Sequence, residues 1–131
     1  KGNKSATLAA PGSWFYLNDG KTKLFDTPII DTENNIHLGI ESVDTDNKKY
    51  AYLRYQPETQ GTYKVTIKIE FAGVDGTVVD ISGGNASATS MTLNNGENTF
   101  EFTFTSDNAS PFQMKFYGIG SYVINVTFSE G

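Results

Sequence analysis

The sequence contains no cysteine, one histidine and one tryptophan among its 131 residues. Without cysteine the domain has no disulfide bonds, which fits a bacterial protein or a reducing compartment and does not distinguish between them. A chain of this length can bury a sizeable core as one domain without a disulfide or a metal. We therefore expect a single domain over residues 1–131.

Basic residues and long apolar runs are also scarce. Lysine and arginine number 10 against 15 acidic residues, which gives a net charge of -5. Proteins that bind nucleic acid need a clustered excess of basic side chains, so we expect no nucleic-acid partner. No apolar run approaches the ~20 residues of a membrane helix, and the first residues match neither a signal peptide nor a lipidation motif. We expect a module without a membrane span, cut from a longer protein and monomeric when isolated.

Helix signals are nearly absent, whereas aromatic residues make up 13% of the chain and glycines number 13. Short apolar stretches with period-two alternation, separated by turn residues, are typical of all-β proteins. The clearest stretch is 62–71, in which Tyr63, Val65, Ile67, Ile69 and Phe71 alternate with polar residues. The pattern predicts strands at 5–9, 14–17, 36–43, 50–55, 62–71, 77–81, 89–93, 100–104, 112–116 and 122–128.

Turn clusters of glycine, asparagine and aspartate separate several of these strands, at 74–76, 82–85, 94–96 and 106–108. Each strand has one apolar face, and burying so many such faces requires a second sheet. The sequence therefore predicts an antiparallel β-sandwich of two sheets, a jelly roll. Residues 26–35 are expected to form an irregular connection and 44–48 a charged turn.

The segment 50–55 carries the main indication of function. Successive side chains of a strand point to opposite faces, so Ala51, Leu53 and Tyr55 share one face. If Leu53 faces the core, then two tyrosines and an arginine lie in a row on the solvent side. These residues are Tyr50, Tyr52 and Arg54.

Other predicted strands contribute polar or aromatic residues to an outer face in the same way. Strand 112–117 leaves three residues outward, strand 36–43 leaves a histidine and a glutamate, and the early strand contributes two aromatics if Phe15 and Leu17 face inward. The further candidate binding residues are thus Gln113, Lys115, Tyr117, His37, Glu41, Trp14 and Tyr16.

Such a set of side chains suits a sugar polymer. Aromatic planes bury the flat C–H faces of a pyranose, and arginine, glutamine, glutamate and lysine hydrogen-bond its hydroxyls. We therefore expect a polysaccharide as the partner, with Tyr50, Tyr52, Tyr117 and Trp14 stacking on sugar rings.

Three stretches of the chain carry a family resemblance: 61–66 (GTYKVT), 98–104 (NTFEFTF) and 120–126 (GSYVINV). In these the chain, from Ile36 onward, resembles the jelly-roll carbohydrate-binding modules of the family 4, family 9 and family 22 type, which are attached to bacterial xylanases and glucanases. The resemblance implies a secreted or cell-surface, non-catalytic module that holds xylan or β-glucan in a groove on one sheet and targets an attached glycoside hydrolase.

Other interpretations of the same residues remain open. Aromatic residues on sheets are often core residues or cross-strand pairs, and Arg54 could pair only with Glu41. A structural or adhesive sandwich of a bacterial surface protein is the main alternative. A small lyase that uses His37, Tyr52 and Arg54 is a weaker one, because catalytic jelly rolls are normally much longer.

No cofactor is expected, although the oxygen-rich segments 26–35 and 44–47 could hold a structural calcium ion. Neither segment matches the ligand spacing of an EF-hand loop.

Overall fold

The computed structural model describes residues 5–7, 15–18, 29–33, 35–40, 51–55, 60–83, 85–86, 89–106 and 112–130. For Tyr16, Tyr52 and Arg54 it describes the backbone only. The described residues form strands and turns, and none of them forms a helix that is long and apolar enough to cross a membrane. Each of the predicted strands overlaps an observed strand.

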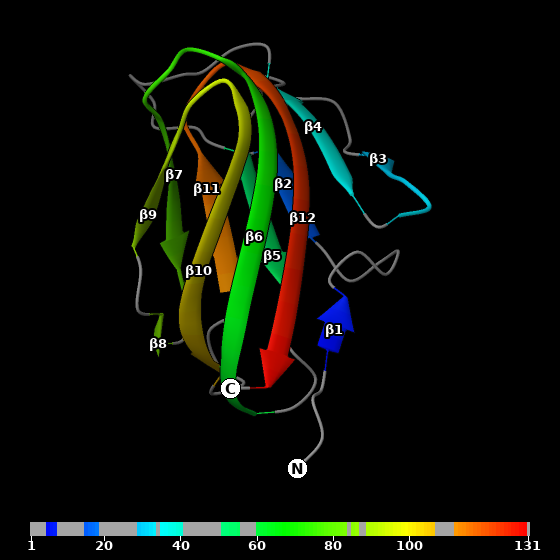
Figure 1. Ribbon diagram of the computed structural model, residues 1–131, viewed down its shortest axis with the longest axis vertical. Coiled ribbons are helices and arrows are strands. Elements are labelled where there is room, and N and C mark those ends of the chain that lie inside the picture. The colour runs from blue at the N-terminus through cyan, green and yellow to red at the C-terminus, as the bar shows by residue number, and fades with distance from the viewer. Residues whose placement is uncertain are drawn as a thin grey trace.

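The strands form two antiparallel sheets, one in front of the other in Figure 1. The seven-stranded sheet has the order β3-β4-β12-β6-β10-β8, and β1 also pairs with β12. Its strands are β1 (Ser5–Thr7), β3 (Ile29–Ile30), β4 (Ile36–Ile40), β6 (Gly61–Gly73), β8 (Asn85–Ala86), β10 (Gly96–Ser106) and β12 (Gly120–Glu130).

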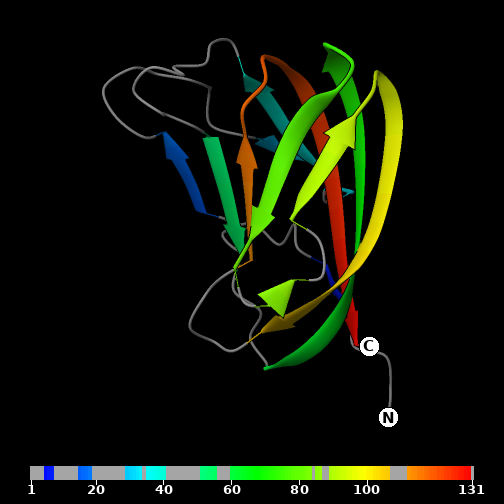
Figure 2. The same ribbon diagram turned by 90° about the vertical axis from the view of Figure 1, so that its left-hand side faces the viewer.

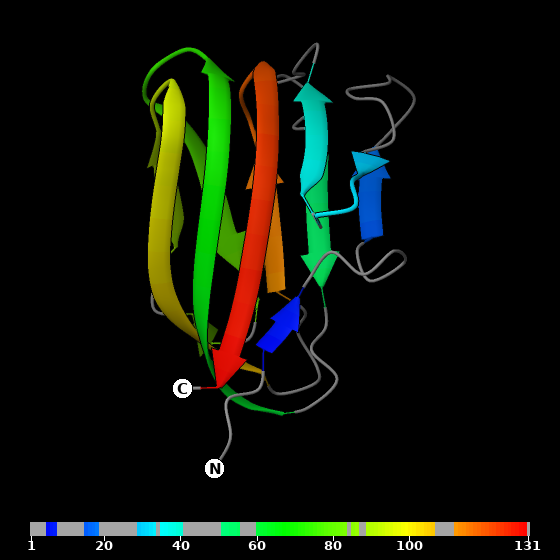
Figure 3. The same ribbon diagram turned by 45° about the vertical axis from the view of Figure 1, so that its right-hand side comes forward.

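The five-stranded sheet has the order β2-β5-β11-β7-β9. Its strands are β2 (Phe15–Asn18), β5 (Ala51–Tyr55), β7 (Thr77–Ser82), β9 (Ser90–Leu93) and β11 (Phe112–Phe116). Figure 2 shows the two sheets from the side, and Figure 3 shows how the long strands β6, β10 and β12 curve over the shorter sheet. The predicted two-sheet sandwich is therefore confirmed.

Alternating apolar residues fill the space between the sheets. The five apolar residues of the strand predicted at 62–71 are all buried, with Val65, Ile67 and Ile69 fully so. On β5 both Leu53 and Tyr55 are buried, as the alternation predicted. Each Å² of apolar surface that is buried stabilises the fold by about 25 cal/mol. The buried residues of these alternating strands are therefore the main source of stability of the sandwich.

Two short strands differ from the sequence prediction. Residues 26–35 were expected to be irregular, but Ile29 and Ile30 form β3 and pair with His37 and Ile36 of β4. Asn85 and Ala86, at the end of a predicted turn, form β8 and pair with Thr105 and Phe104 of β10. Both strands have only two residues, which is too short for any periodicity to be visible in the sequence.

Candidate functional site

The register of the five-stranded sheet brings several predicted residues together on its outer face. Gln113 of β11 lies opposite Ser82 of β7, and Lys115 lies opposite Asp80. Their neighbours on β11, Phe112, Met114 and Phe116, are buried in the core, so the polar residues between them face outward. The structure therefore places Gln113, Lys115 and the adjoining Tyr117 on one surface.

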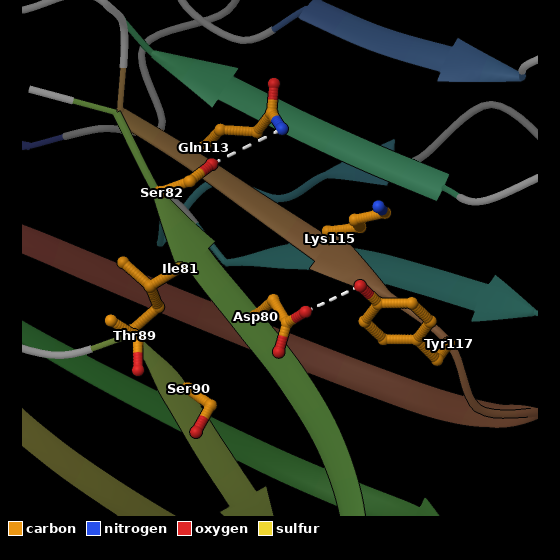
Figure 4. A pocket seen from close by; sticks show the side chains of 8 residues that line it. All are labelled: Asp80, Ile81, Ser82, Thr89, Ser90, Gln113, Lys115 and Tyr117. Carbon is orange, nitrogen blue, oxygen red and sulfur yellow. Dashed lines mark hydrogen bonds between the residues drawn. The ribbon is translucent and has the colours of Figure 1, made fainter.

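This surface is hollowed. A hollow of about 470 Å³, which we call the Tyr117 hollow, lies over β7, β9 and β11. Figure 4 shows the side chains that line it, which are Asp80, Ile81, Ser82, Thr89, Ser90, Gln113, Lys115 and Tyr117. Most of these groups can donate or accept hydrogen bonds, and three of them carry hydroxyl groups on short side chains.

Tyr117 is held in place by its neighbours. Its hydroxyl donates a hydrogen bond of 2.5 Å to Oδ2 of Asp80, and Nζ of Lys115 lies 5.3 Å from the centre of its ring. Partial burial, together with this hydrogen bond to Asp80, raises the pKa of Tyr117 above its usual value. The phenol is therefore neutral at physiological pH and its ring is fixed at the edge of the hollow.

Gln113 lies at the other side of the hollow. Its Nε2 is 3.5 Å from Oγ of Ser82, a long and weak hydrogen bond.

Five lining residues were absent from the residues predicted from the sequence: Asp80, Ile81, Ser82, Thr89 and Ser90. The alternation in 77–82 contained a signal for two of them, because Val79 and Ile81 are buried and the residues that follow each of them face outward. What the sequence did not contain is the order of the strands, which places β7 and β9 beside β11.

The same sheet continues over β5 and β2. Tyr52 takes the register position opposite Lys115, and Arg54 the position opposite Gln113. Tyr16 of β2 is opposite Leu53, whose side chain is buried, whereas Leu17 is opposite Tyr52. Tyr16 was expected on the outer face beside Tyr52 only if Leu17 faces inward. The register instead pairs Leu17 with Tyr52, so this condition is not met. Trp14, Glu41 and Tyr50 lie outside the described residues.

His37 is not brought together with these residues. It belongs to β4, which pairs with β12 in the seven-stranded sheet, so its exposed side chain lies on the opposite side of the sandwich. The grouping of His37 with Tyr52 and Arg54, on which the lyase interpretation depended, is therefore not supported. Alternation shows which residues of a strand face outward, but it does not show to which sheet the strand belongs.

His37 instead contributes to the turn between β3 and β4. Its Nε2 lies 2.8 Å from Oδ2 of Asp31. The backbone N–H groups of Glu33 and Asn35 each donate a bond of 2.9 Å to Oδ1 of Asp31. The bond to His37 and these backbone bonds lower the pKa of Asp31 to about 2. This carboxylate thus stabilises its own turn.

A second hollow, of about 380 Å³, lies on the outer face of the seven-stranded sheet. We call it the Glu70 hollow, and it is lined by Glu33, Asn35, Lys68, Glu70, Glu97, Val123 and Asn125. It contains no aromatic ring, and it carries three carboxylates against one amine. The two faces of the sandwich therefore differ in chemistry.

The suggested calcium segments find little support in the described part of the chain. No group of three or more histidine or acidic side chains suited to a metal occurs among the described residues. Within 26–35, the carboxylate of Asp31 bonds to its own turn, and residues 44–47 lie outside the described ranges.

Comparison with known proteins gives a fold and no family. No protein-family model matches the sequence, and no curated protein sequence matches it. Among solved structures, the apo form of CBM1 of BiXyn10A matches with a TM-score of 0.64 and 17% identity, over 98% of this chain and 96% of that chain. The C-terminal CBM6 of LamC, a marine laminarinase from Zobellia galactanivorans, matches with a TM-score of 0.59 and 9% identity, over 97% of this chain and 100% of that chain.

A third match is the K1 cleaved adhesin domain of Lys-gingipain from Porphyromonas gingivalis W83, with a TM-score of 0.61 and 10% identity, over 100% of this chain and 99% of that chain. The chain thus has the β-sandwich fold of carbohydrate-binding modules, as the resemblance in sequence implied. An adhesin domain shares this fold, so the ligand must be argued from the site.

Proposed function

We propose that the chain is a non-catalytic carbohydrate-binding module that holds a plant-type β-glycan, xylan or β-glucan, across the outer face of its five-stranded sheet. The observation that carries the proposal is the Tyr117 hollow. There an immobilised aromatic ring stands beside an amide, an amine, a carboxylate and three hydroxyl groups.

The chemistry of the hollow matches the two surfaces of a pyranose. The ring of Tyr117 can cover the C–H face of a sugar, and the polar groups around it can bond to the hydroxyls. Covering about 100 Å² of apolar sugar surface stabilises the complex by about 2.5 kcal/mol at 25 cal/mol per Å². Tyr52 and Arg54 extend the same surface across β5, because their register positions lie opposite Lys115 and Gln113.

With two or three such rings, less the cost of ordering the glycan, the affinity falls in the range of about 1 µM to 1 mM. This range suits a module that keeps an attached, secreted glycoside hydrolase near its substrate. Tyr50 belongs to the proposed surface by sequence alone. Trp14 and Glu41 were grouped there together with Tyr16 and His37 on the same predicted strands. The register of Tyr16 opposite the buried Leu53, and the place of β4 in the other sheet, do not support that grouping.

The carboxylates favour binding over hydrolysis. A glycosidase requires two carboxyl groups about 5 to 10 Å apart on either side of the bond that it cleaves. Among the described residues that line the Tyr117 hollow, Asp80 provides the single carboxylate, and its Oδ2 accepts the Tyr117 hydroxyl hydrogen.

Affinity electrophoresis against a panel of soluble xylans and β-glucans tests the proposal. We expect the wild type to be retarded by at least one glycan, and the variants Tyr117→Ala and Tyr52→Ala each to weaken binding about tenfold or more, from the loss of roughly 2 kcal/mol of stacking. Lys68→Gln, in the Glu70 hollow, should bind as the wild type does. Wild-type mobility unchanged by every glycan would overturn the proposal and favour an adhesive role. Equal retardation of the wild type and both tyrosine variants would overturn the site.

A further inference from the structure

We propose that the Tyr117 hollow selects a β-glycan that carries uronic acid groups, and that Lys115 is the residue that recognises the sugar carboxylate. This inference rests on the proposed function, because it specifies the ligand of the same surface. The chemical class is an acidic β-glycan, such as a xylan with glucuronic acid side groups.

The position of Lys115 suits this role. Its Nζ lies over the ring of Tyr117, 5.3 Å from the ring centre, so the amine borders the space next to the ring in which a sugar would be held. Lys115 also stands in the middle of a row across the sheet, between Asp80 on β7 and the register position of Tyr52 on β5. A substituent at the edge of a sugar stacked on Tyr117 therefore comes within reach of the ammonium group.

The described lining of the hollow carries one carboxylate, that of Asp80, and one amine, that of Lys115. Oδ2 of Asp80 accepts the hydroxyl hydrogen of Tyr117 over 2.5 Å, which directs that carboxylate toward the phenol. The described lining of the Tyr117 hollow therefore has no net charge, although the whole chain has a net charge of -5.

The hollow on the opposite face of the sandwich is more negative. The Glu70 hollow is lined by Glu33, Glu70 and Glu97 against Lys68 alone. Glu97 lies directly opposite Glu70 in the register of β10 and β6, an arrangement that repels anions. The Glu70 hollow therefore disfavours an anionic glycan relative to the Tyr117 hollow.

The expected selectivity is modest. An ammonium that meets a carboxylate at a partly exposed site strengthens binding by about three- to tenfold, and salt weakens the effect. At about 0.5 M sodium chloride the screening length falls to about 4 Å, so most of the preference should disappear.

Isothermal titration calorimetry with two forms of one polysaccharide tests the inference. The first ligand is soluble glucuronoxylan, and the second is the same preparation after chemical reduction of its carboxyl groups to alcohols. The backbone is then constant and only the charge differs. We expect the wild type to bind the acidic form about three- to tenfold more tightly at low salt, and nearly equally at high salt.

Two variants that each remove one positive charge distinguish an effect of Lys115 itself from an effect of the net charge of the protein. Lys115→Gln should bind the two forms with equal affinity, and Lys68→Gln should keep the wild-type preference. Equal binding of both forms by the wild type, a preference that survives in Lys115→Gln, or the same loss in Lys68→Gln would each overturn the inference while the proposed function stands. Absence of binding to either form, and to every neutral β-glycan, would instead overturn the proposed function.

Discussion

Tyr122 is fully buried, and its side-chain hydroxyl has a hydrogen-bond partner inside the protein. Its ring centre lies 5.0 Å from that of Phe71 and 5.1 Å from that of Phe116. Its hydroxyl donates a hydrogen bond of 2.8 Å to the carbonyl oxygen of Gly118. Burial raises the pKa of Tyr122 to about 12, because the phenolate would lose its hydration in the core.

This pKa shift predicts a loss of stability at alkaline pH. The unfolded chain releases the Tyr122 proton from about pH 10 upward, whereas the folded protein keeps it until about pH 12. Between these values the unfolded state binds fewer protons, so the free energy of unfolding decreases as pH rises, by about 2 to 3 kcal/mol. Urea unfolding at a series of pH values between 7 and 12 measures the decrease.

Tyr122→Phe is the matched variant for that measurement. It removes the bond to Gly118 and should lower the stability at neutral pH by about 1 kcal/mol. Its stability should then fall less between about pH 10 and 12, so that the two curves converge or cross. Parallel curves for the wild type and the variant would contradict the assignment of the alkaline transition to Tyr122.

At the scale of elements, two neighbouring turns are joined by one asparagine side chain. Asn95, in the turn between β9 and β10, accepts a bond of 3.0 Å from the backbone N–H of Gly73 and donates one of 2.7 Å to the Gly73 carbonyl. Its Nδ2 also donates a bond of 2.9 Å to Asp75, in the turn between β6 and β7. The backbone N–H of Asn95 donates a further bond of 2.8 Å to Oδ1 of Asp75, and this bond together with the one from Nδ2 lowers the pKa of Asp75. The bonds of Asn95 connect the two sheets at this end of the sandwich.

We therefore predict that Asn95→Ala lowers the free energy of unfolding by about 1 to 3 kcal/mol, because the backbone groups of Gly73 lose their partner. Asn94→Ala is the matched control. The hydrogen bonds of Asn94 with Asn98 use its backbone N–H and carbonyl, which the substitution leaves in place. It should change the free energy of unfolding by less than about 0.5 kcal/mol. Thermal unfolding of the two variants compares them directly. An equal effect of both substitutions would show that the bonds of Asn95 do not join the turns energetically.

Strands with a long run of alternating apolar residues could be predicted from the sequence. Strands that form only because a neighbouring strand pairs with them could not. The alternation in β6 and β12 identified both strands and their buried faces. The short strands β3 and β8 exist because β4 and β10 offer unpaired backbone groups beside them. The grouping of Gln113, Lys115 and Tyr117 required only the alternation of one strand. The addition of Asp80 and the separation of His37 required the strand order, which periodicity does not contain.

At the scale of the whole molecule, the two sheets are held together by interlocked aromatic rings. Phe128 of the seven-stranded sheet is fully buried and lies 5.5 Å from Tyr55 and 5.3 Å from Phe112 of the five-stranded sheet, measured between ring centres. It also contacts Tyr63 and Phe104 within its own sheet. Phe112 belongs to β11, which also carries Gln113 and Lys115 of the Tyr117 hollow. The packing of Phe128 against Phe112 therefore supports the strand that forms this outer face.

Phe128→Leu should consequently weaken both sheets together. The substitution leaves a cavity between the sheets and should cost about 1 to 3 kcal/mol, a large share of the 5 to 15 kcal/mol typical of a domain. Because unfolding of a domain of this size is cooperative, we expect hydrogen exchange to accelerate by the same factor at the most protected amides of β6 and of β11. Ile119→Ala, at a side chain that is 53% exposed, serves as the control and should leave both rates nearly unchanged. Faster exchange in the seven-stranded sheet alone would show that the sheets unfold separately, and that the binding surface does not depend on the aromatic core.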